Sequence, residues 1–278
     1  MPVSRPTASR RVAALSSTLA ISVALTAFGA APAFAAAPTQ TIAAVQGDAA
    51  GGVSPLVGTV QTVEGVVTAD YRGASGYRGI VIQSVGSGGA VDATPGASDG
   101  IFVFLGDTNP TVVIGDRISA SGSIVENFAQ TQIGGGAAPA TVELIAAKAD
   151  VPASDVPVAA PLAESEVGAA REALESQLVA PTGTYSISSA HQLFNFGTLW
   201  LTPGAERLVK NTETTDATDP AAAQIQASNR AKRLLLDDGY SIAVTNAAHL
   251  GTQPYFSTTP IVRSGDTVDF PAQPYVLG

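Results

Sequence analysis

Residues 59–71 have the sequence TVQTVEGVVTADY, in which four valines lie among Thr and Gly, and β-branched residues in such a run favour a strand. Four similar runs follow: RGIVIQSV (78–85), DGIFVFLG (99–106), DRISASGSIVE (116–126) and ATVELIA (140–146). Clusters of Gly, Ser, Asp and Pro separate them. Five short strands at this spacing predict a small closed barrel or sandwich over residues 47–147, with the five-stranded OB barrel as the natural candidate.

The rest of the chain predicts a connector and a second β module. Residues 148–180 contain Pro152, Pro157 and Pro161 and then strong helix formers, which indicates a Pro-rich, partly helical connector. Residues 181–278 return to alternating apolar and polar positions, interrupted by a polar loop at 208–220 and a short helix at 221–233. We expect an all-β protein with two OB-like β-barrel modules joined by this connector.

A short sequence repeat supports two copies of one architecture. VVIGDRISASG (112–122) and IVRSGDTVDFPA (261–272) both place Gly-Asp just before an alternating strand. The second copy has no convincing last strand after Leu277, so we expect the module at 181–278 to be incomplete.

Residues 1–35 have the three-part pattern of a secretory signal peptide. A basic start with Arg5, Arg10 and Arg11 precedes an apolar stretch, and Ala33-Phe34-Ala35 offers a cleavage site. The alternative is an uncleaved anchor, but no charged stop-transfer cluster follows. Ala13 and Ala14 favour the Sec route over the twin-arginine route. We therefore predict a secreted protein without membrane contact after cleavage, with residues 36–46 as a linker.

Charge argues against a strongly basic nucleic-acid binder. The chain carries a formal net charge of −9, and losing the three signal-peptide arginines takes it to −12. Lys and Arg clusters usually dominate nucleic-acid affinity. The nearest approach to such a cluster is Arg230, Lys232 and Arg233. There are no cysteines, so core burial or bound ions must stabilise the exported chain.

The sequence offers several weak candidate sites. Asp107 and Asn109 follow a strand as in metal-dependent phosphodiesterases, but Gly106 and Pro110 favour a turn. Acidic loops at Asp92, Asp99, Asp237 and Asp238 could hold Ca²⁺ or be solvated turns.

The sequence lacks the motifs of known catalytic and zinc sites. It contains no nucleophile elbow, P-loop or zinc-protease motif, and only two histidines. We therefore predict no catalytic residue in this chain.

Aromatic residues provide one further candidate for ligand binding. Phe194, Phe196 and Trp200 are predicted to alternate along one strand. They could stack on bases or sugars if they face outward, or lie in the core.

Several sequence segments together resemble the N-terminal OB-fold-like region of large secreted bacterial endonucleases. They include SPLVGTVQTVEGVVTADY, SDGIFVF, VVIGDRISASGSIVENFAQTQI, FNFGTLWLTPGAERL and NRAKRLLLDDG, in the order found in that family. Ser176 stands where the family has Gly after Glu, and Ser84 where Asp is common. The resemblance implies that catalysis belongs to a separate C-terminal endonuclease/exonuclease/phosphatase domain, the only part expected to need Mg²⁺ or Ca²⁺.

The combined expectation is a secreted, non-catalytic accessory region. It would position DNA or RNA weakly, or dock onto a catalytic phosphodiesterase domain. The alternative is an extracellular structural or adhesive β module with no nucleic-acid role, which suits the acidic, Ala- and Gly-rich composition. An intact enzyme with an unrecognised site is a third possibility.

Overall fold

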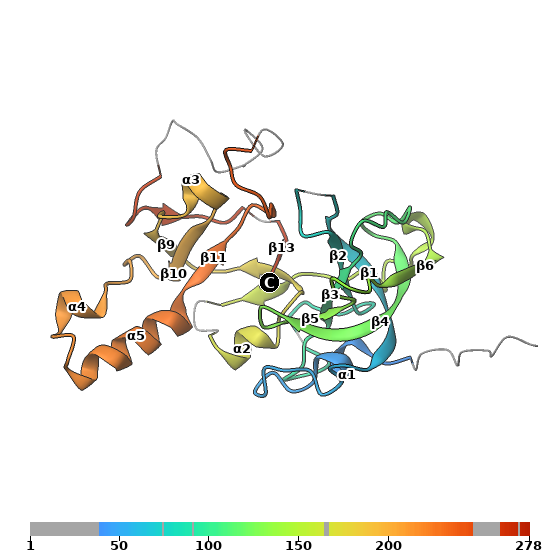
Figure 1. Ribbon diagram of the computed structural model, residues 1–278, viewed down its shortest axis with the longest axis horizontal. Helices are drawn as coiled ribbons and strands as arrows, with labels where there is room; N and C mark the ends of the chain where they lie inside the picture. The colour runs from blue at the N-terminus through green and yellow to red at the C-terminus, as the bar shows by residue number, and fades with distance from the viewer. Residues whose placement is uncertain (1–38, 74, 91, 164–166, 247–261, 272) are drawn as a thin grey trace, which may run out of the picture. The chain divides into compact units, whose positions relative to one another are not determined.

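The computed structural model describes residues 39–73, 75–90, 92–163, 167–246, 262–271 and 273–278. Most of the regular structure there is β-strand, arranged in three sheets (Figure 1), so the predicted β-rich fold class is confirmed. The predicted signal peptide (1–35) lies outside the described residues. Within the described ranges, every helix falls short of the length and apolar character that a bilayer-spanning segment requires.

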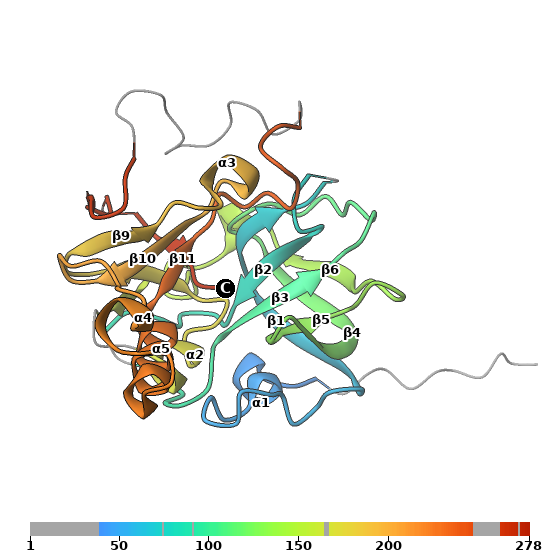
Figure 2. The same ribbon diagram turned by 60° about the vertical axis from the view of Figure 1, so that its left-hand side comes forward.

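Five strands of the first sheet close into a ring. The strands of this sheet are β1 (Val60–Tyr71), β2 (Gly79–Gln83), β3 (Gly100–Phe104), β4 (Arg117–Asn127), β5 (Gln130–Ile133) and β6 (Thr141–Ala146). Pairing runs from β1 through β2, β3, β5 and β4, and β4 returns to β1 (Figure 2). Only the β3–β5 pair of this ring is parallel, and β6 is added outside it on β4.

The interior of this ring is an apolar core closed by a short helix. Successive strand side chains point to opposite faces, so Ile80 and Ile82 of β2 share the inner face with Ile101 of β3, and all three are fully buried. Helix α1 (Ile42–Gln46) packs Ile42 and Val45 against them. The structure differs here from the predicted linker at 36–46, because a five-residue helix is too short to show helical periodicity.

The β4–β5 hairpin has a strained two-residue turn. Asn127 pairs with Gln130, and the two residues between them, Phe128 and Ala129, have φ values of 54° and 68°. A turn with positive φ at both central positions favours Asn-Gly, because other side chains meet the backbone in this conformation. Phe128 is also fully exposed.

We expect the double change Phe128→Asn with Ala129→Gly to raise the free energy of unfolding by about 1–2 kcal/mol, because it relieves strain at both positions. Urea unfolding followed by circular dichroism measures the gain. The control is Phe128→Ala, which removes the exposed ring and keeps both positive φ angles, and should have little effect. Equal stability of the wild type and the double variant would contradict the prediction.

The Gly-Asp repeat adopts the same geometry in both halves of the chain. Gly115 and Gly265 have φ values of 99° and 97°. Their N–H groups donate to the carbonyls of Val67 and Ile187, at 2.8 and 2.7 Å. In both copies the aspartate carboxylate accepts the N–H of the residue three positions earlier, at 2.9 and 2.8 Å. The sequence repeat therefore corresponds to a repeated connection between two strands.

Two smaller sheets make up the second half. The four-stranded sheet contains β9 (Tyr185–Ser189), β10 (Leu199–Pro203), β11 (Leu234–Leu236) and β12 (Thr267–Val268), in the order β11–β10–β9–β12. Tyr185, Ile187, Leu199 and Leu201 form its core. The three-stranded sheet contains β7 (Ala160–Leu162), β8 (Leu178–Pro181) and β13 (Tyr275–Val276).

The segment expected to be only a connector contributes to a sheet. Residues 148–180 contain a 3-10 turn, η1 (Lys148–Asp150), a single turn of helix, α2 (Ala169–Glu172), and most of β7 and β8. Both strands belong to the sheet that ends in β13. Strands of three and four residues are shorter than the alternation pattern can detect, so the sequence showed only the prolines and helix formers.

A polar network joins the turn before β8 to the first sheet, within the compact unit Ala37–Gly278. The Gln46 side chain donates to the Gly100 carbonyl at 2.6 Å and to the Glu175 carboxylate at 3.1 Å. The Thr131 N–H donates to the same carboxylate at 3.1 Å. Ser176 is fully buried with a φ of 58°, the conformation that glycine adopts most easily.

Candidate functional site

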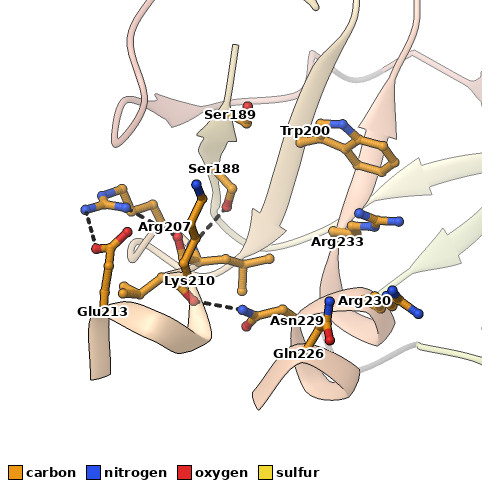
Figure 3. A pocket seen from close by; sticks show the side chains of 12 residues that line it. Ser188, Ser189, Trp200, Arg207, Lys210, Glu213, Gln226, Asn229, Arg230 and Arg233 are labelled. Atoms are coloured by element: carbon orange, nitrogen blue, oxygen red, sulfur yellow. Dashed lines mark hydrogen bonds and ion pairs between the residues drawn. The ribbon is translucent and has the colours of Figure 1, made fainter. Parts of the chain in front are cut away.

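A cavity of about 630 Å³ lies where the four-stranded sheet meets a polar helical insertion (Figure 3). The insertion contains α4 (Asn211–Thr214) and α5 (Pro220–Lys232). Asp219 caps α5 by accepting the Ala221 N–H at 2.8 Å, and Pro220 occupies the first helical turn, as is common. The helix predicted at 221–233 is therefore present almost as expected.

Hydrogen bonds hold the loop before α4 against both walls of the cavity. The Leu208 N–H donates to Ser188 Oγ of β9 at 3.0 Å. The Asn229 side chain of α5 donates to the Val209 carbonyl at 2.8 Å. A third bond, from the Asn211 side chain to a carbonyl of α5, is 3.2 Å long. The polar residues of this insertion thus fix the loop rather than leave it solvated.

Four cationic side chains line the cavity beside a single acidic one. Arg207 and Lys210 come from the loop, Arg230 from α5 and Arg233 from the residue that follows α5, with Glu213 as the only acidic lining residue. In a chain of net charge −9, this is a local concentration of positive charge.

Most of this positive charge is not paired. Arg207 and Glu213 lie 3.8 Å apart and both are exposed, so this ion pair contributes little stability. Among the described residues, Lys210, Arg230 and Arg233 have no ion-pair partner within 4.0 Å. Their charges are therefore available to an anionic ligand.

Trp200 supplies an aromatic wall. The Arg233 guanidinium lies over its ring, 4.3 Å from the centroid, and Figure 3 shows the two side by side. Trp200 pairs with Leu235 across β10 and β11, and Arg233 precedes Leu235 by two residues, which places it on the same face as the ring. The Arg233 carbonyl also accepts a 2.8 Å hydrogen bond from Arg171.

Comparison with protein-family models, with curated protein sequences and with solved structures found no match.

Three of the six residues predicted to bind ligand come together in this cavity: Trp200, Arg230 and Arg233. Lys232 is exposed on α5 and does not line the cavity. Sequence reasoning missed Arg207 and Lys210. The sequence does show a concentration of basic residues here, since five of the 14 Lys and Arg residues lie in the segment from Arg207 to Arg233.

The prediction that Phe194, Phe196 and Trp200 alternate along one strand is wrong. Both phenylalanines belong to α3 (Leu193–Phe196), and only Trp200 lies on β10. Gly197, with a φ of 73°, ends this helical turn and redirects the chain into the strand. The phenylalanines are 67% and 47% exposed and do not line the cavity, so they are not core residues either.

The acidic loops use their carboxylates in protein hydrogen bonds. Asp92 and Asp99 both accept from the Thr94 side chain, at 3.4 and 3.0 Å. Asp237 accepts from the Tyr77 hydroxyl at 2.8 Å, and Asp238 from a backbone N–H. Within the described ranges no three His, Cys, Asp or Glu residues gather as a metal site. Calcium binding by these four residues stays a prediction without geometric support.

Asp107 and Asn109 take part in contacts of a turn. Asp107 forms an exposed 2.7 Å ion pair with Arg78. The Asn109 side chain accepts a 3.1 Å hydrogen bond from Arg72, which also pairs with Asp70. That pairing with Arg72 lowers the pKa of the Asp70 carboxyl. These contacts favour the turn interpretation of residues 106–110.

Proposed function

We propose that this chain is a secreted, non-catalytic accessory region that binds nucleic acid for a partner phosphodiesterase. The observation that carries the proposal is the cavity in which Trp200 lies beside four cationic side chains. Positive charge that neutralises phosphates, combined with an aromatic surface for bases, is the usual combination in nucleic-acid binding proteins. The resemblance to secreted endonucleases points to the same ligand.

The architecture proposed for the region is a pair of OB-like modules. In support, the ring of β1, β2, β3, β5 and β4 has the strand number of an OB barrel and encloses an apolar core. The repeated Gly-Asp connection supports a related second module over 181–278. The export pattern of residues 1–35 supports secretion, and the partner phosphodiesterase would be a C-terminal or separate domain.

The Arg230→Glu variant tests the proposal. We expect the mature chain to bind a labelled oligonucleotide at low salt, with an affinity that falls steeply as salt rises. Arg230→Glu should weaken binding about tenfold and reduce the salt dependence, because one phosphate contact becomes a repulsion. Fluorescence anisotropy at several salt concentrations measures both effects.

Lys232→Glu is the matched control. It makes the same charge change on the same helix, two residues away, but outside the cavity. We expect it to change the affinity less than about twofold. An equal loss in both variants would show that only the overall charge matters. No binding at low salt would overturn the proposal and favour the structural or adhesive alternative.

A further inference from the structure

The cavity is large enough for one small unit of a polymer. Its volume of about 630 Å³ lies within the roughly 300–1,000 Å³ of small-molecule pockets. Duplex DNA presents its phosphates on a convex surface, with base edges in grooves that a helix or ribbon must enter. A single strand can instead turn one unstacked base into a concave pocket.

The Trp200–Arg233 pair forms a platform on which a base can stack. Bases stack on aromatic rings and on guanidinium planes, and here the Arg233 guanidinium lies over the Trp200 ring, 4.3 Å from its centroid, so that the two groups form one stack. Trp200 is half-buried on β10, so the sheet fixes the ring. Arg233 follows the last residue of α5 in an extended conformation, and its N–H and carbonyl are both hydrogen-bonded, which fixes its backbone as well.

Cationic and amide groups lie around this platform. Lys210 and Arg230 line the same cavity without an ion-pair partner among the described residues, so they can bind the phosphates flanking the stacked base. Gln226 lies one helical turn before Arg230 and also lines the cavity. Its amide can both donate to and accept from the edge of a base.

We infer that the cavity binds a single-stranded nucleic acid through one nucleotide, with the base against the Trp200–Arg233 platform and its phosphates on Lys210 and Arg230. This inference rests on the proposed nucleic-acid function and adds that the ligand is single-stranded and enters base first.

Trp200 makes the inference directly measurable, because it is the only tryptophan in the chain. Its fluorescence is recorded while the mature chain is titrated with a single-stranded oligonucleotide, with a hairpin duplex of the same composition, and with inorganic polyphosphate. We expect saturable quenching by the single strand and at least tenfold weaker binding of the duplex. Polyphosphate supplies charge without bases and should bind without comparable quenching.

The failure of this inference differs from the failure of the proposed function. If anisotropy detects single-strand binding but Trp200 fluorescence does not change, no base stacks on the platform. That result would overturn the inference and leave the proposed nucleic-acid function standing. Equal affinity for single strand and duplex would also overturn it. Absence of binding by every nucleic acid would remove the proposed function itself, and the inference with it.

Two substitutions of Trp200 separate stacking from folding. Trp200→Phe keeps an aromatic face, and Trp200→Leu removes it. By anisotropy, we expect Trp200→Leu to weaken single-strand binding about tenfold or more, and Trp200→Phe to weaken it less. The affinity for polyphosphate should change little in both variants. Circular dichroism confirms folding of each variant. Equal single-strand affinity of the wild type and a folded Trp200→Leu would contradict the inference.

Discussion

Replacing Gly100 with alanine is expected to lower the free energy of unfolding by about 3 kcal/mol, one of the largest effects of a single methyl group in this chain. Gly100 begins β3, where the turn before β8 packs directly on its backbone. A Cβ at this position would lie 2.2 Å from both the carbonyl carbon and the oxygen of Ser176, and 2.6 Å from the Gln177 nitrogen.

The collision cannot be relieved by rotating a side chain, because all three of these atoms belong to the backbone. The turn would have to move away from β3. That movement would break the hydrogen bond that Gln46 donates to the Glu175 carboxylate, and the one that the Ser98 hydroxyl donates to the Glu175 carbonyl. Buried polar groups left without partners add their own cost to the steric one.

Gly136→Ala is the control for this substitution. A Cβ at Gly136 would meet no heavy atom within 4 Å beyond its own chain neighbours, and Gly136 does not adopt a positive φ. We expect that change to alter stability by less than about 0.5 kcal/mol. Urea unfolding of the three proteins, followed by circular dichroism, gives the comparison. If Gly100→Ala is as stable as Gly136→Ala, the turn does not depend on close contact with β3.

Five of the six strands of the first sheet could be predicted, because each run carries its own local signal. The predicted run at 140–146 is β6, which lies outside the ring, and the ring strand β5 was missed. Residues 59–71 and 116–126 alternate over enough positions to show which face is buried, and β1 and β4 correspond to them. Helix α5 was predictable for a similar reason, since Asp219 and Pro220 mark its start. The elements that were missed, among them α1, β5, β7 and β8, are five residues or shorter.

The candidate site could be predicted only in part, because its geometry depends on long-range pairing. Arg230 and Arg233 were visible as a short basic run, and Trp200 as a lone tryptophan on an apolar segment. Their proximity depends on the β10–β11 pairing, which places Arg233 on the same face as Trp200. The contribution of Arg207 and Lys210 depends on the hydrogen bond from Leu208 to Ser188. No local pattern encodes either contact.

Stability is expected to fall as pH rises from about 4.5 to about 7, because of one buried carboxyl group. Glu175 is only 6% exposed. Its pKa is raised to about 7, and burial is the largest cause. The hydrogen bonds from Gln46 and Thr131 lower the pKa, and the neighbouring carboxylates Glu172 and Glu126 raise it. Burial, followed by the charge of Glu126, also raises the pKa of Glu172.

The direction of the pH effect follows from proton binding. Between the ordinary carboxyl pKa and about 7, the folded protein holds a proton on Glu175 that the unfolded chain has released. The stabilising contribution of the protonated group is therefore complete below about pH 4.5 and is lost as pH rises through about 7. A raised pKa of this size corresponds to a free energy on the order of 3 kcal/mol.

Glu175→Gln isolates this contribution, because glutamine keeps the carbonyl oxygen that Gln46 and Thr131 donate to and removes the charge. We expect the variant to be about 2 kcal/mol more stable than the wild type at pH 8, and nearly equal to it at pH 4. Urea unfolding across this pH range gives the free energy of unfolding of both proteins. The difference between the two at each pH cancels the contributions of other carboxyl groups, such as Asp70, whose pKa is lowered rather than raised. Glu143→Gln, the same change at an exposed position of β6, should show no such dependence. A Glu175→Gln variant that is less stable than the wild type at pH 8 would mean that the folded protein favours the charged carboxylate, contrary to the burial argument.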